Sequence, residues 1–590
     1  MPFSFASFPF HGHRQWWYFV GMSWKVIENR RNTLAGESGA LQQKRGGRLS
    51  CCVVYPNRYH SAMSNLGFQT VYALLNEHAE VVCDRAFLPD REELGELERT
   101  RGTLLSLETQ RPLSSFDLIA FSVSFESDYL NIPVIFRLSG IPPLAAERSP
   151  LQPLVLAGGA ALFLNPEPVA PLLDLVCIGE AEPLLPGVID LFLEGAESRD
   201  DLLTRAAQLP GVYVPSLYEP VYDGARQVAL HAQAGAPQRV RRIWDPEIEA
   251  RPTVTEIHTE ATEFSGMHLV ELSRGCPRAC RFCAAGFIYL PYRTRSVEVV
   301  RDEVLKGVAE GRKVGLVAAA VSDYRGIGDL CQEIIDAGGT FSVSSFRIDH
   351  LDSAMIEALK ASGQKTVALA PEGGSQRLRD LIRKGIDEEQ ILSACDLLIG
   401  HDILNLKLYF IIGLPTETAQ DLEELVSLVL KIRERVVTAA KANKRLGEIQ
   451  LSVNPFIPKP FTPFQWCGME DMKSIEKKWK FLQKAFGKHA NLRIQMESPR
   501  EAYQQALFSR GDRRLAPLLI EADRQGNWKS ALREMEFDSD SFVYRDIPLE
   551  EMLPWSFIDG GDEARLVREY RRAFGLEREP GEADQQELPK

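Results

Sequence analysis

Long hydrophobic runs are missing from this sequence. No apolar segment reaches the roughly 20 residues that a bilayer-spanning helix needs. The aromatic segment 16–24 is too short, and it has neither a basic lead nor a small-residue cleavage site. We therefore expect residues 1–47 to be an irregular N-terminal extension, and we expect no membrane partner. The alternative for the aromatic segment is an anchor at a membrane surface.

Cysteines are few in this sequence, and acidic residues outnumber basic ones. The ten cysteines among 590 residues show no regular pairing, so no disulfide framework is indicated. This usage is typical of a reducing, cytoplasmic setting, in which clustered cysteines usually bind metal or carry redox chemistry. The formal net charge of −13 argues against nonspecific nucleic-acid binding, so a nucleic-acid partner is not indicated.

Short apolar runs alternate with helical patterns between residues 48 and 190. This alternation predicts parallel βαβ units and hence a doubly wound α/β sheet. Helices are expected at 66–76 and 130–138. The predicted strands are 49–55, 80–86, 118–124, 154–157 and 175–178. Ligands of such sheets bind at the carboxyl ends of the strands.

A second α/β alternation covers residues 263–495. About six βα units of this size predict a partial (β/α)6 barrel, in which chemistry belongs at the carboxyl ends of the strands. The predicted strands are 268–273, 314–320, 341–345, 366–370, 405–412 and 449–454.

The remaining segments have weaker patterns. Residues 191–262 are interrupted by prolines and are expected to connect the two α/β regions. Residues 496–576 are predicted to be mostly helical. The polar tail 577–590 is predicted to be disordered.

A cysteine cluster is the sharpest chemical signal. Cys276, Cys280 and Cys283 form a C-x3-C-x2-C loop directly after the first barrel strand. Short loops of this kind hold iron–sulfur clusters through thiolates, and three thiolates on a four-iron cluster leave one iron open to an outside ligand. One alternative is zinc, which needs a fourth protein ligand that no histidine or cysteine in the next forty residues supplies. The other is three unrelated thiols.

This C-x3-C-x-aromatic-C loop after the first strand of a βα barrel resembles that of the radical S-adenosylmethionine (SAM) superfamily. The resemblance implies an enzyme whose [4Fe–4S] cluster reductively cleaves SAM to methionine and a 5′-deoxyadenosyl radical. It also implies an electron donor such as flavodoxin or ferredoxin. By the same pattern Phe282 lies beside the adenine of SAM, with a plain packing role as the alternative.

Two further strand ends carry candidate SAM contacts. Glu372 and Gly373 follow the fourth barrel strand, where glycine lets the backbone approach a ligand and the carboxylate accepts hydrogen bonds from hydroxyl or ammonium groups. The resemblance assigns this strand end to the ribose or methionine part of SAM. The alternative for Glu372 is a favourable carboxylate at a helix start. The resemblance also assigns Ile411 and Gly413 of the fifth strand to the adenine.

The sequence departs from the superfamily pattern at the second barrel strand. The glycine-glycine-glutamate motif that holds the SAM amino group is missing, and Ser322 and Asp323 are the only polar candidates nearby. Lys407 on the fifth strand and Arg347 after the third are candidates to balance the SAM carboxylate. The alternative for both is a snorkelling or paired basic residue.

The two α/β regions together resemble radical SAM proteins with an N-terminal cobalamin-binding-type domain. The resemblance rests on segments 55–67, 156–160 and 178–182 and spans residues 48–555. It implies cobalamin as a further cofactor. The D-x-H-x-x-G motif that provides a cobalt-ligating histidine is absent, so a vestigial or substrate-recognition domain is the alternative.

Three functions are therefore considered. The favoured one is a radical SAM enzyme acting on an unknown substrate, with methylation of an unactivated carbon as its natural reaction if cobalamin binds. Without cobalamin, hydrogen abstraction, rearrangement and sulfur insertion are the alternatives. A methylthiotransferase of tRNA or a ribosomal protein would need a second three-cysteine cluster, but Cys51, Cys52 and Cys83 have the spacing of core thiols. A non-catalytic iron–sulfur protein would not need the polar and glycine residues at the strand ends.

Overall fold

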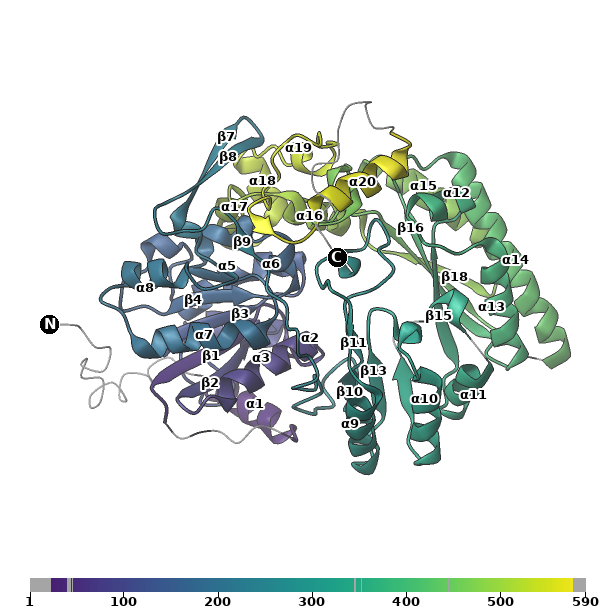
Figure 1. Ribbon diagram of the computed structural model, residues 1–590, viewed down its shortest axis with the longest axis horizontal. Helices are drawn as coiled ribbons and strands as arrows, with labels where there is room; N and C mark the ends of the chain where they lie inside the picture. The colour runs from purple at the N-terminus through teal and green to yellow at the C-terminus, as the bar shows by residue number, and fades with distance from the viewer. Residues whose placement is uncertain are drawn as a thin grey trace, which may run out of the picture.

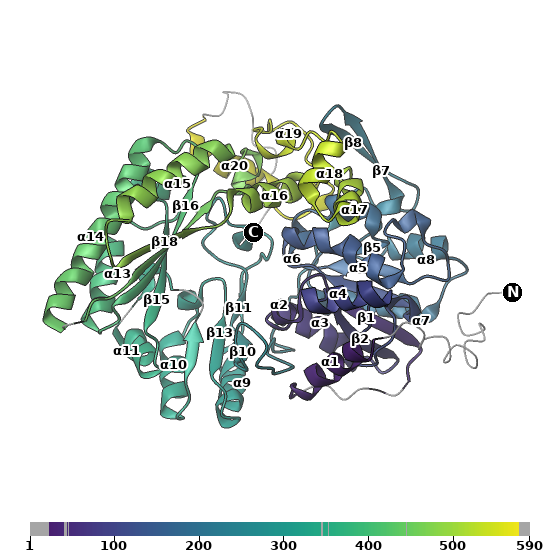
Figure 2. The same ribbon diagram turned by 180° about the vertical axis from the view of Figure 1, so that it is seen from behind.

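The computed structural model of the chain describes residues 23–39, 44, 46–343, 346–351, 353–443 and 445–576. Two α/β lobes lie side by side, and the C-terminal helices lie across the top of both (Figures 1 and 2). The expected disordered tail, 577–590, and most of the N-terminal extension lie outside the described residues. No helix in the described ranges is long and apolar enough to cross a membrane.

The N-terminal lobe confirms the predicted doubly wound sheet. Its strand order is β2-β1-β3-β4-β5-β6, and all neighbours are parallel except β5 and β6. The direction of winding reverses between β1 and β3, which opens a crevice at the carboxyl edge. The strands are β1 (Leu49–Tyr55), β2 (Val81–Phe87), β3 (Leu118–Ser122), β4 (Leu154–Gly158), β5 (Leu175–Cys177) and β6 (Val212–Tyr213).

Successive side chains of these strands point to opposite faces of the sheet. Cys51 and Val53 belong to the core on one face, whereas Cys52 and Val54 belong to the core on the other. The covering helices are α3 (Leu66–Glu77) and α7 (Ala181–Glu194) on the first face and α4 (Arg91–Thr100) and α5 (Asn131–Ser139) on the second. Burial on both faces explains why most of these strands are mostly apolar in sequence.

The segment expected only to connect the lobes, residues 191–262, also extends the N-terminal sheet. It contributes β6, the helix α8 (Arg199–Ala206) and the antiparallel hairpin of β7 (Tyr218–Asp223) and β8 (Arg226–Ala232). β6 has only two residues and lies between Pro210 and Pro215, so it is too short to show a period in the sequence.

The N-terminal extension is not irregular throughout. Its described part contains α1 (Trp24–Ala35), which the sequence did not predict. Arg30 of α1 forms a bidentate, buried ion pair with Glu93 of α4. This ion pair holds α1 in place. Because its two residues are 63 positions apart, no local pattern in the sequence predicts it.

The second lobe contains the six predicted strands and one more. Three parallel strands form one sheet, and four form another. The strands are β10 (His268–Glu271), β13 (Val314–Val317) and β14 (Phe341–Val343), then β15 (Thr366–Glu372), β16 (Asn405–Ile412), β17 (Ile449–Pro455) and β18 (Leu492–Met496). In the described part of the chain no ladder joins the two sheets, so the barrel is partial, as predicted.

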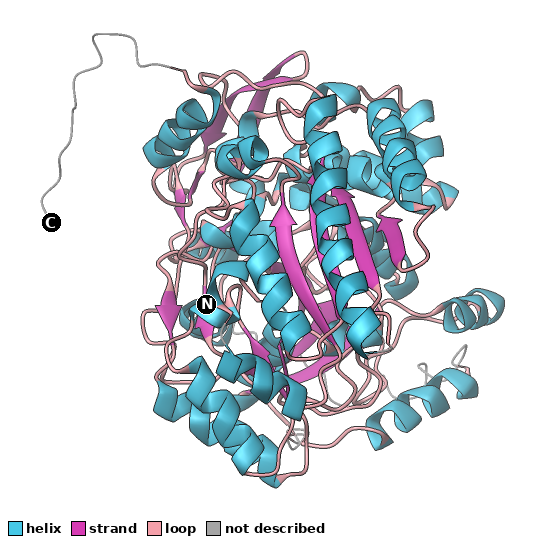
Figure 3. Ribbon diagram, turned by 90° about the vertical axis from the view of Figure 1, so that its right-hand side faces the viewer, coloured by secondary structure: helices cyan, strands magenta, loops and turns pink. Residues whose placement is uncertain are grey.

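Helices cover the outer face of these strands (Figure 3). They are α9 (Val297–Ala309), α10 (Ile327–Asp336), α11 (Ser353–Ala361), α13 (Glu388–Gly400), α14 (Ala419–Asn443) and α15 (Met472–Phe486). Side chains along β16 alternate between buried and half-buried. The buried set, such as Leu406 and Leu408, packs under the helices, so the half-buried set faces the interior of the lobe.

The C-terminal region ties the two lobes together. Phe508 of α16 (Pro499–Arg510) shares a core with Tyr129 and Phe136 of the N-terminal lobe. Glu569 of α20 (Glu563–Phe574) forms a 3.1 Å ion pair with Arg281 in the cysteine loop. The remaining helices are α17 (Leu515–Gln525), α18 (Trp528–Glu534) and α19 (Asp540–Val543).

Gly179, directly after β5, allows the sheet edge to pack closely on the connecting chain. Its φ is +138°, and a Cβ there would lie 2.1 Å from the carbonyl oxygen of Ile243. We expect Gly179→Ala to lower the melting temperature measured by circular dichroism, because the added atom forces the two backbones apart. Gly187→Ala in α7 is the control: its nearest neighbour is 3.9 Å away, and alanine favours a helix. Equal melting of Gly179→Ala and wild type would contradict this packing.

Candidate functional site

The cysteine loop begins at the carboxyl end of the first strand of the second lobe. It leaves β11 (Ser273–Arg274), which pairs antiparallel with β12 (Arg293–Thr294). Gly275 has φ +82° and Ala279 has φ +53°, so the chain turns tightly between the cysteines. A Cβ on Gly275 would lie 2.6 Å from the carbonyl oxygen of Tyr289, so this turn requires glycine.

The three thiols of the loop differ from the other seven in the chain. Cys276, Cys280 and Cys283 are half-exposed, whereas the others are buried. Burial, together with the charges of Cys280 and Cys276, raises the pKa of Cys283 to about 11, so the three sulfurs lie near one another. Within the described ranges no three His, Cys, Asp or Glu side chains are placed to hold a single metal ion. An iron–sulfur cluster differs from such a site because each thiolate binds its own iron.

A carboxylate and an ammonium group face the cysteine loop from the end of β15. Glu372 has φ +62°, and Nζ of Lys384 lies 3.4 Å from its Oε1. Burial raises the pKa of Glu372, and Lys384 opposes that shift. Burial also raises the pKa of Cys280, which is near enough to Lys384, Arg347 and Glu372 to feel their charges. Glu372 and Arg347 thus lie near the cysteine loop, together with Lys384, which follows α12 (Gln376–Leu381) and belongs to no sequence motif.

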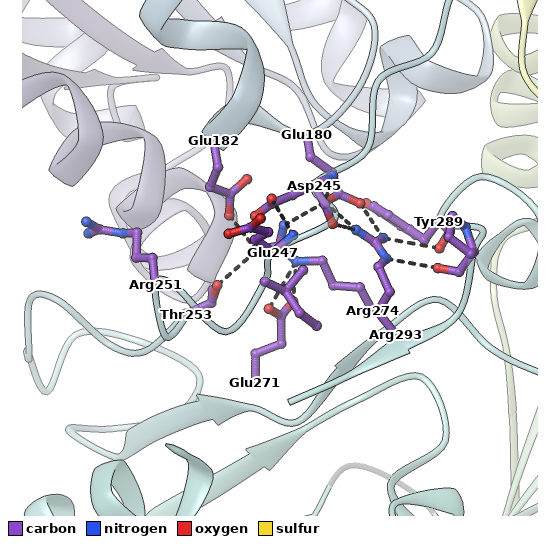
Figure 4. A network of polar contacts seen from close by, with 12 residues as sticks. Glu180, Glu182, Asp245, Glu247, Arg251, Thr253, Glu271, Arg274, Tyr289 and Arg293 are labelled. Carbon is purple, nitrogen blue, oxygen red and sulfur yellow. Dashed lines mark hydrogen bonds and ion pairs between the residues drawn. The ribbon is translucent and has the colours of Figure 1, made fainter. Parts of the chain in front are cut away.

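An ion-pair network joins the N-terminal sheet to the cysteine loop (Figure 4). Arg274 lies two residues before Cys276 and donates to Glu180 at 2.8 Å and to Glu182 at 2.5 Å. Arg293 donates to both carboxylate oxygens of Glu180, at 2.6 and 2.9 Å. Both glutamates follow β5, so the two arginines connect the lobes. The sequence did not predict these pairs, because the partners are 94 and 113 residues apart.

The network is charged and largely shielded from water. Burial works to raise the pKa of Glu180, but the hydrogen bonds from Arg293 and the charges of Arg274 and Arg293 outweigh it, so the pKa lies below its usual value. On the other side Glu271 of β10 accepts from Arg274 at 3.0 Å and from Arg295 at 2.6 Å. The network therefore extends from the turn after β5 to the strand that precedes the cysteine loop.

A cavity of about 590 Å³ lies between the carboxyl edge of the N-terminal sheet and the second lobe. The ends of β3, β4 and β5 supply a lining rich in small residues, among them Ser122, Ala157, Gly158 and Gly159. The cavity extends to Gly275 of the cysteine loop. None of the described residues that line it is a histidine.

Comparisons with known proteins identify the family. Residues 67–215 match the family described as radical SAM proteins, N-terminal, and residues 270–429 match the radical SAM superfamily. The uncharacterized protein MJ0966 of Methanocaldococcus jannaschii is 30% identical over 488 residues, which are 82% of this chain and 93% of that protein. The chain belongs to the radical SAM superfamily.

Two further proteins are similar to this radical SAM protein, at lower identity or over a smaller part of the chain. The radical S-adenosylmethionine methyltransferase TsrM from Kitasatospora setae, solved with cobalamin and a [4Fe-4S] cluster bound, matches with a TM-score of 0.50 and 14% identity, over 81% of this chain and 100% of that chain. This likeness shows the fold alone. The ribosomal protein uS12 methylthiotransferase RimO of Thermosipho africanus is 27% identical over 176 residues, 28% of this chain and 41% of that protein.

The two apolar residues expected to contact SAM lie beside the same hydrophobic cluster. Phe282 of the cysteine loop and Ile411 of β16 pack against the same hydrophobic cluster, which contains Leu378 and Leu414. A shared apolar surface beside the loop is what an adenine ring would need. The contact with adenine itself stays a prediction.

The two glycines expected to admit SAM are both explained by protein packing. A Cβ on Gly373 would lie 2.9 Å from the backbone nitrogen of Arg379. Gly413 has φ +73°, and a Cβ there would lie 2.5 Å from Cδ1 of Ile475 on α15. The fold therefore needs glycine at both positions, and their approach to SAM stays a prediction.

The polar residues expected to hold the amino-acid part of SAM have partners within the protein. The hydroxyl of Ser322 accepts a hydrogen bond from the N–H of Arg347 at 3.1 Å. The guanidinium of Arg347 pairs with Asp349 at 2.9 Å. Asp323 pairs with Arg278 of the cysteine loop at 2.5 Å. These contacts position the loop and the strand ends, and a second role in SAM binding stays a prediction.

Lys407 lies apart from the strand-end residues. It precedes Ile411 by four positions on β16, about 13 Å at the rise of an extended strand. Its Nζ lies 4.9 Å from the ring centre of Tyr409 on the same inward face. Lys407 thus lies on the inward face of β16, and its contact with the SAM carboxylate stays a prediction.

We expect Glu180→Gln to destabilise the protein by about 3 kcal/mol, because two buried guanidinium groups lose their shared carboxylate. The folded pKa of Glu180 is lowered, so its stabilisation is complete above the usual glutamate value of 4.5 and is lost as the pH falls through the lower folded value. Denaturant unfolding of both proteins from about pH 7 to about pH 3 should show a difference that shrinks in acid.

The control for this experiment is Glu194→Gln. Glu194 pairs with Arg205 at the surface, where its side chain is 65% exposed. Its replacement should change the free energy of unfolding by less than about 0.5 kcal/mol. A Glu180→Gln protein as stable as the control at neutral pH would show that the network does not hold the lobes together.

Proposed function

We propose that Cys276, Cys280 and Cys283 of this radical SAM enzyme hold a [4Fe–4S] cluster whose open iron binds SAM. The observation that carries the proposal is the gathering of three half-exposed thiols opposite Glu372 and Lys384. When bound and reduced, the cluster supplies the electron that cleaves SAM into methionine and a 5′-deoxyadenosyl radical. A ferredoxin- or flavodoxin-type protein is the proposed electron donor.

The residues around the loop would bind and orient SAM. Arg278, held by Asp323, adds positive charge beside thiolates that carry negative charge. Glu372 presents a carboxylate for the ribose hydroxyls or the ammonium group of SAM. Phe282 and Ile411 offer an apolar surface to the adenine. The partial barrel surrounds these groups and limits the access of water to the radical.

We further propose that the cavity between the lobes holds a corrinoid. Its volume of about 590 Å³ is within the range of cofactor sites, and the small side chains of Ala157, Gly158 and Gly159 leave room for a broad ring. The fold-level likeness to TsrM supports the same assignment by analogy. A bound corrinoid would supply a methyl carrier, which makes methylation of an unactivated carbon the proposed reaction class.

A methylthiotransferase has less support. Cys51 and Cys83 are register partners on β1 and β2, and Cys52 lies beside them. All three are buried, at 0%, 3% and 0% exposure, respectively, and burial raises the pKa of both Cys52 and Cys83. These thiols therefore fill the core and do not form an accessible second cluster site.

The cluster assignment predicts SAM cleavage by anaerobically reconstituted, reduced protein. 5′-Deoxyadenosine, measured by liquid chromatography, should form with wild type and fall to background with Cys280→Ala, which lacks one of the three thiolates. Cys395→Ala, which removes a buried thiol on α13, should remain active. A wild-type protein with a full cluster that cleaves no SAM would overturn the assignment.

The corrinoid assignment is tested separately at Ser122, which lines the cavity at the end of β3. After incubation with hydroxocobalamin and desalting, wild type and Ser122→Ala should retain the corrinoid, as seen by its absorbance. Ser122→Trp should not, because the indole fills the space. Iron content should be equal in all three proteins. Retention by Ser122→Trp, or none by wild type, would sink the corrinoid assignment and leave that of the cluster untouched.

A further inference from the structure

A second cavity, of about 560 Å³, lies on the other side of segment 284–292, which follows the cysteine loop. Phe287 and Tyr292 line this cavity, whereas Ala285 and Tyr289 line the cavity proposed for the corrinoid. One short segment therefore separates the two spaces. The other walls come from β9 (Val240–Arg241), from β19 (Ile558–Asp559), which pairs with β9, and from the start of α20.

Four arginines and three acidic residues line this second cavity, and Arg242 is the buried one among them. The arginines that line it are Arg239, Arg241, Arg242 and Arg565. None of them forms an ion pair within the described part of the chain. The acidic lining residues, Asp559, Asp562 and Glu563, are all exposed. The carboxylate of Asp562 is already engaged, because it accepts from the N–H of Arg565 at 2.9 Å and from Arg568 at 3.3 Å.

Arg242 is the buried member of this set, at 8% exposure. Its Nη2 donates to the carbonyl oxygen of Phe287 at 3.0 Å and to that of Gly560, while Nη1 has no hydrogen-bond partner among the described residues. Carbonyl oxygens orient a guanidinium but do not neutralise it, and an unpaired buried charge is costly. Burial lowers the pKa of Arg242 to about 10, so the group remains charged at neutral pH.

The walls around this charge are aromatic. Trp244, Phe287, Phe461 and Trp555 line the cavity. The guanidinium of Arg242 lies 5.6 Å from the ring centre of Phe461, and that of Arg565 lies 5.8 Å from that of Phe287. A planar or apolar body would pack on these rings, and an oxyanion on it would accept hydrogen bonds from the guanidinium groups.

We infer that the second cavity is a binding site for an oxyanion, a carboxylate or a phosphate, carried on an aromatic or apolar body. Arg242 is its central anion-binding residue, and Arg565 is a second one at the rim. The inference does not rest on the proposed cluster or corrinoid, because it uses only the charge and the walls of this cavity. A ligand held here would contact the segment that directly follows the cysteine loop.

Isothermal titration calorimetry of the full-length, cluster-containing protein tests this site. The probes are phenyl phosphate, benzoate and the neutral compound benzyl alcohol. We expect saturable binding of at least one anion, and binding of benzyl alcohol at least about tenfold weaker. The anion that binds with the higher affinity shows whether the site prefers a phosphate or a carboxylate. Absence of binding by both anions up to about 10 mM, or equal binding of the neutral probe, would overturn the inference.

Substitutions assign the binding to this cavity. Arg242→Gln, which keeps a hydrogen-bond donor but removes the charge, should weaken anion binding at least about tenfold with unchanged iron content. Arg565→Gln should weaken anion binding several-fold. This variant tests the site if Arg242→Gln does not fold. Arg226→Gln, on the exposed hairpin strand β8, is the matched control and should bind as wild type does. Wild-type affinity in both Arg242→Gln and Arg565→Gln would contradict the site.

Discussion

The rest of the site depends on the pairing of Arg274 with Glu180 and Glu182. Arg274 lies two residues before Cys276, whereas Glu180 and Glu182 lie at the start of α7, which follows β5. The charges are largely shielded from water, so separating them would leave buried charges without a partner, which is strongly unfavourable. This constraint fixes the distance between the cysteine loop and the carboxyl edge of the N-terminal sheet, and with it the width of the cavity between them.

The segment from Gly275 to Tyr292 connects the cysteine loop with both cavities. It carries the three accessible thiols, and its residues line both cavities. Arg281 pairs with Glu569 of α20, and Arg278 pairs with Asp323 in the short 3-10 helix that follows β13. A radical reaction needs its cofactor and its substrate held in register. A loop anchored on the N-terminal sheet, the partial barrel and the C-terminal helix meets that need.

Much of the fold was predictable from the sequence, but the partners within the site were not. β1 and β16 were predicted to the residue because each is a short, mostly apolar run. β6 and α1 were missed because one has two residues and the other is held by a distant ion pair. The C-x3-C-x2-C spacing predicted the role of the three cysteines in the loop. Lys384 and the pairing of Arg274 with Glu180 depend on contacts between distant segments, which leave no pattern in a single sequence.

Electron paramagnetic resonance of the anaerobically reduced protein, recorded before and after SAM is added, tests the central claim most directly. Three thiolates leave one iron of the cluster open, so the spectrum of a reduced [4Fe–4S] cluster should appear and then change when SAM binds to that iron. A cluster spectrum that SAM leaves unchanged, or a protein that contains only zinc with the three cysteines intact, would contradict the account.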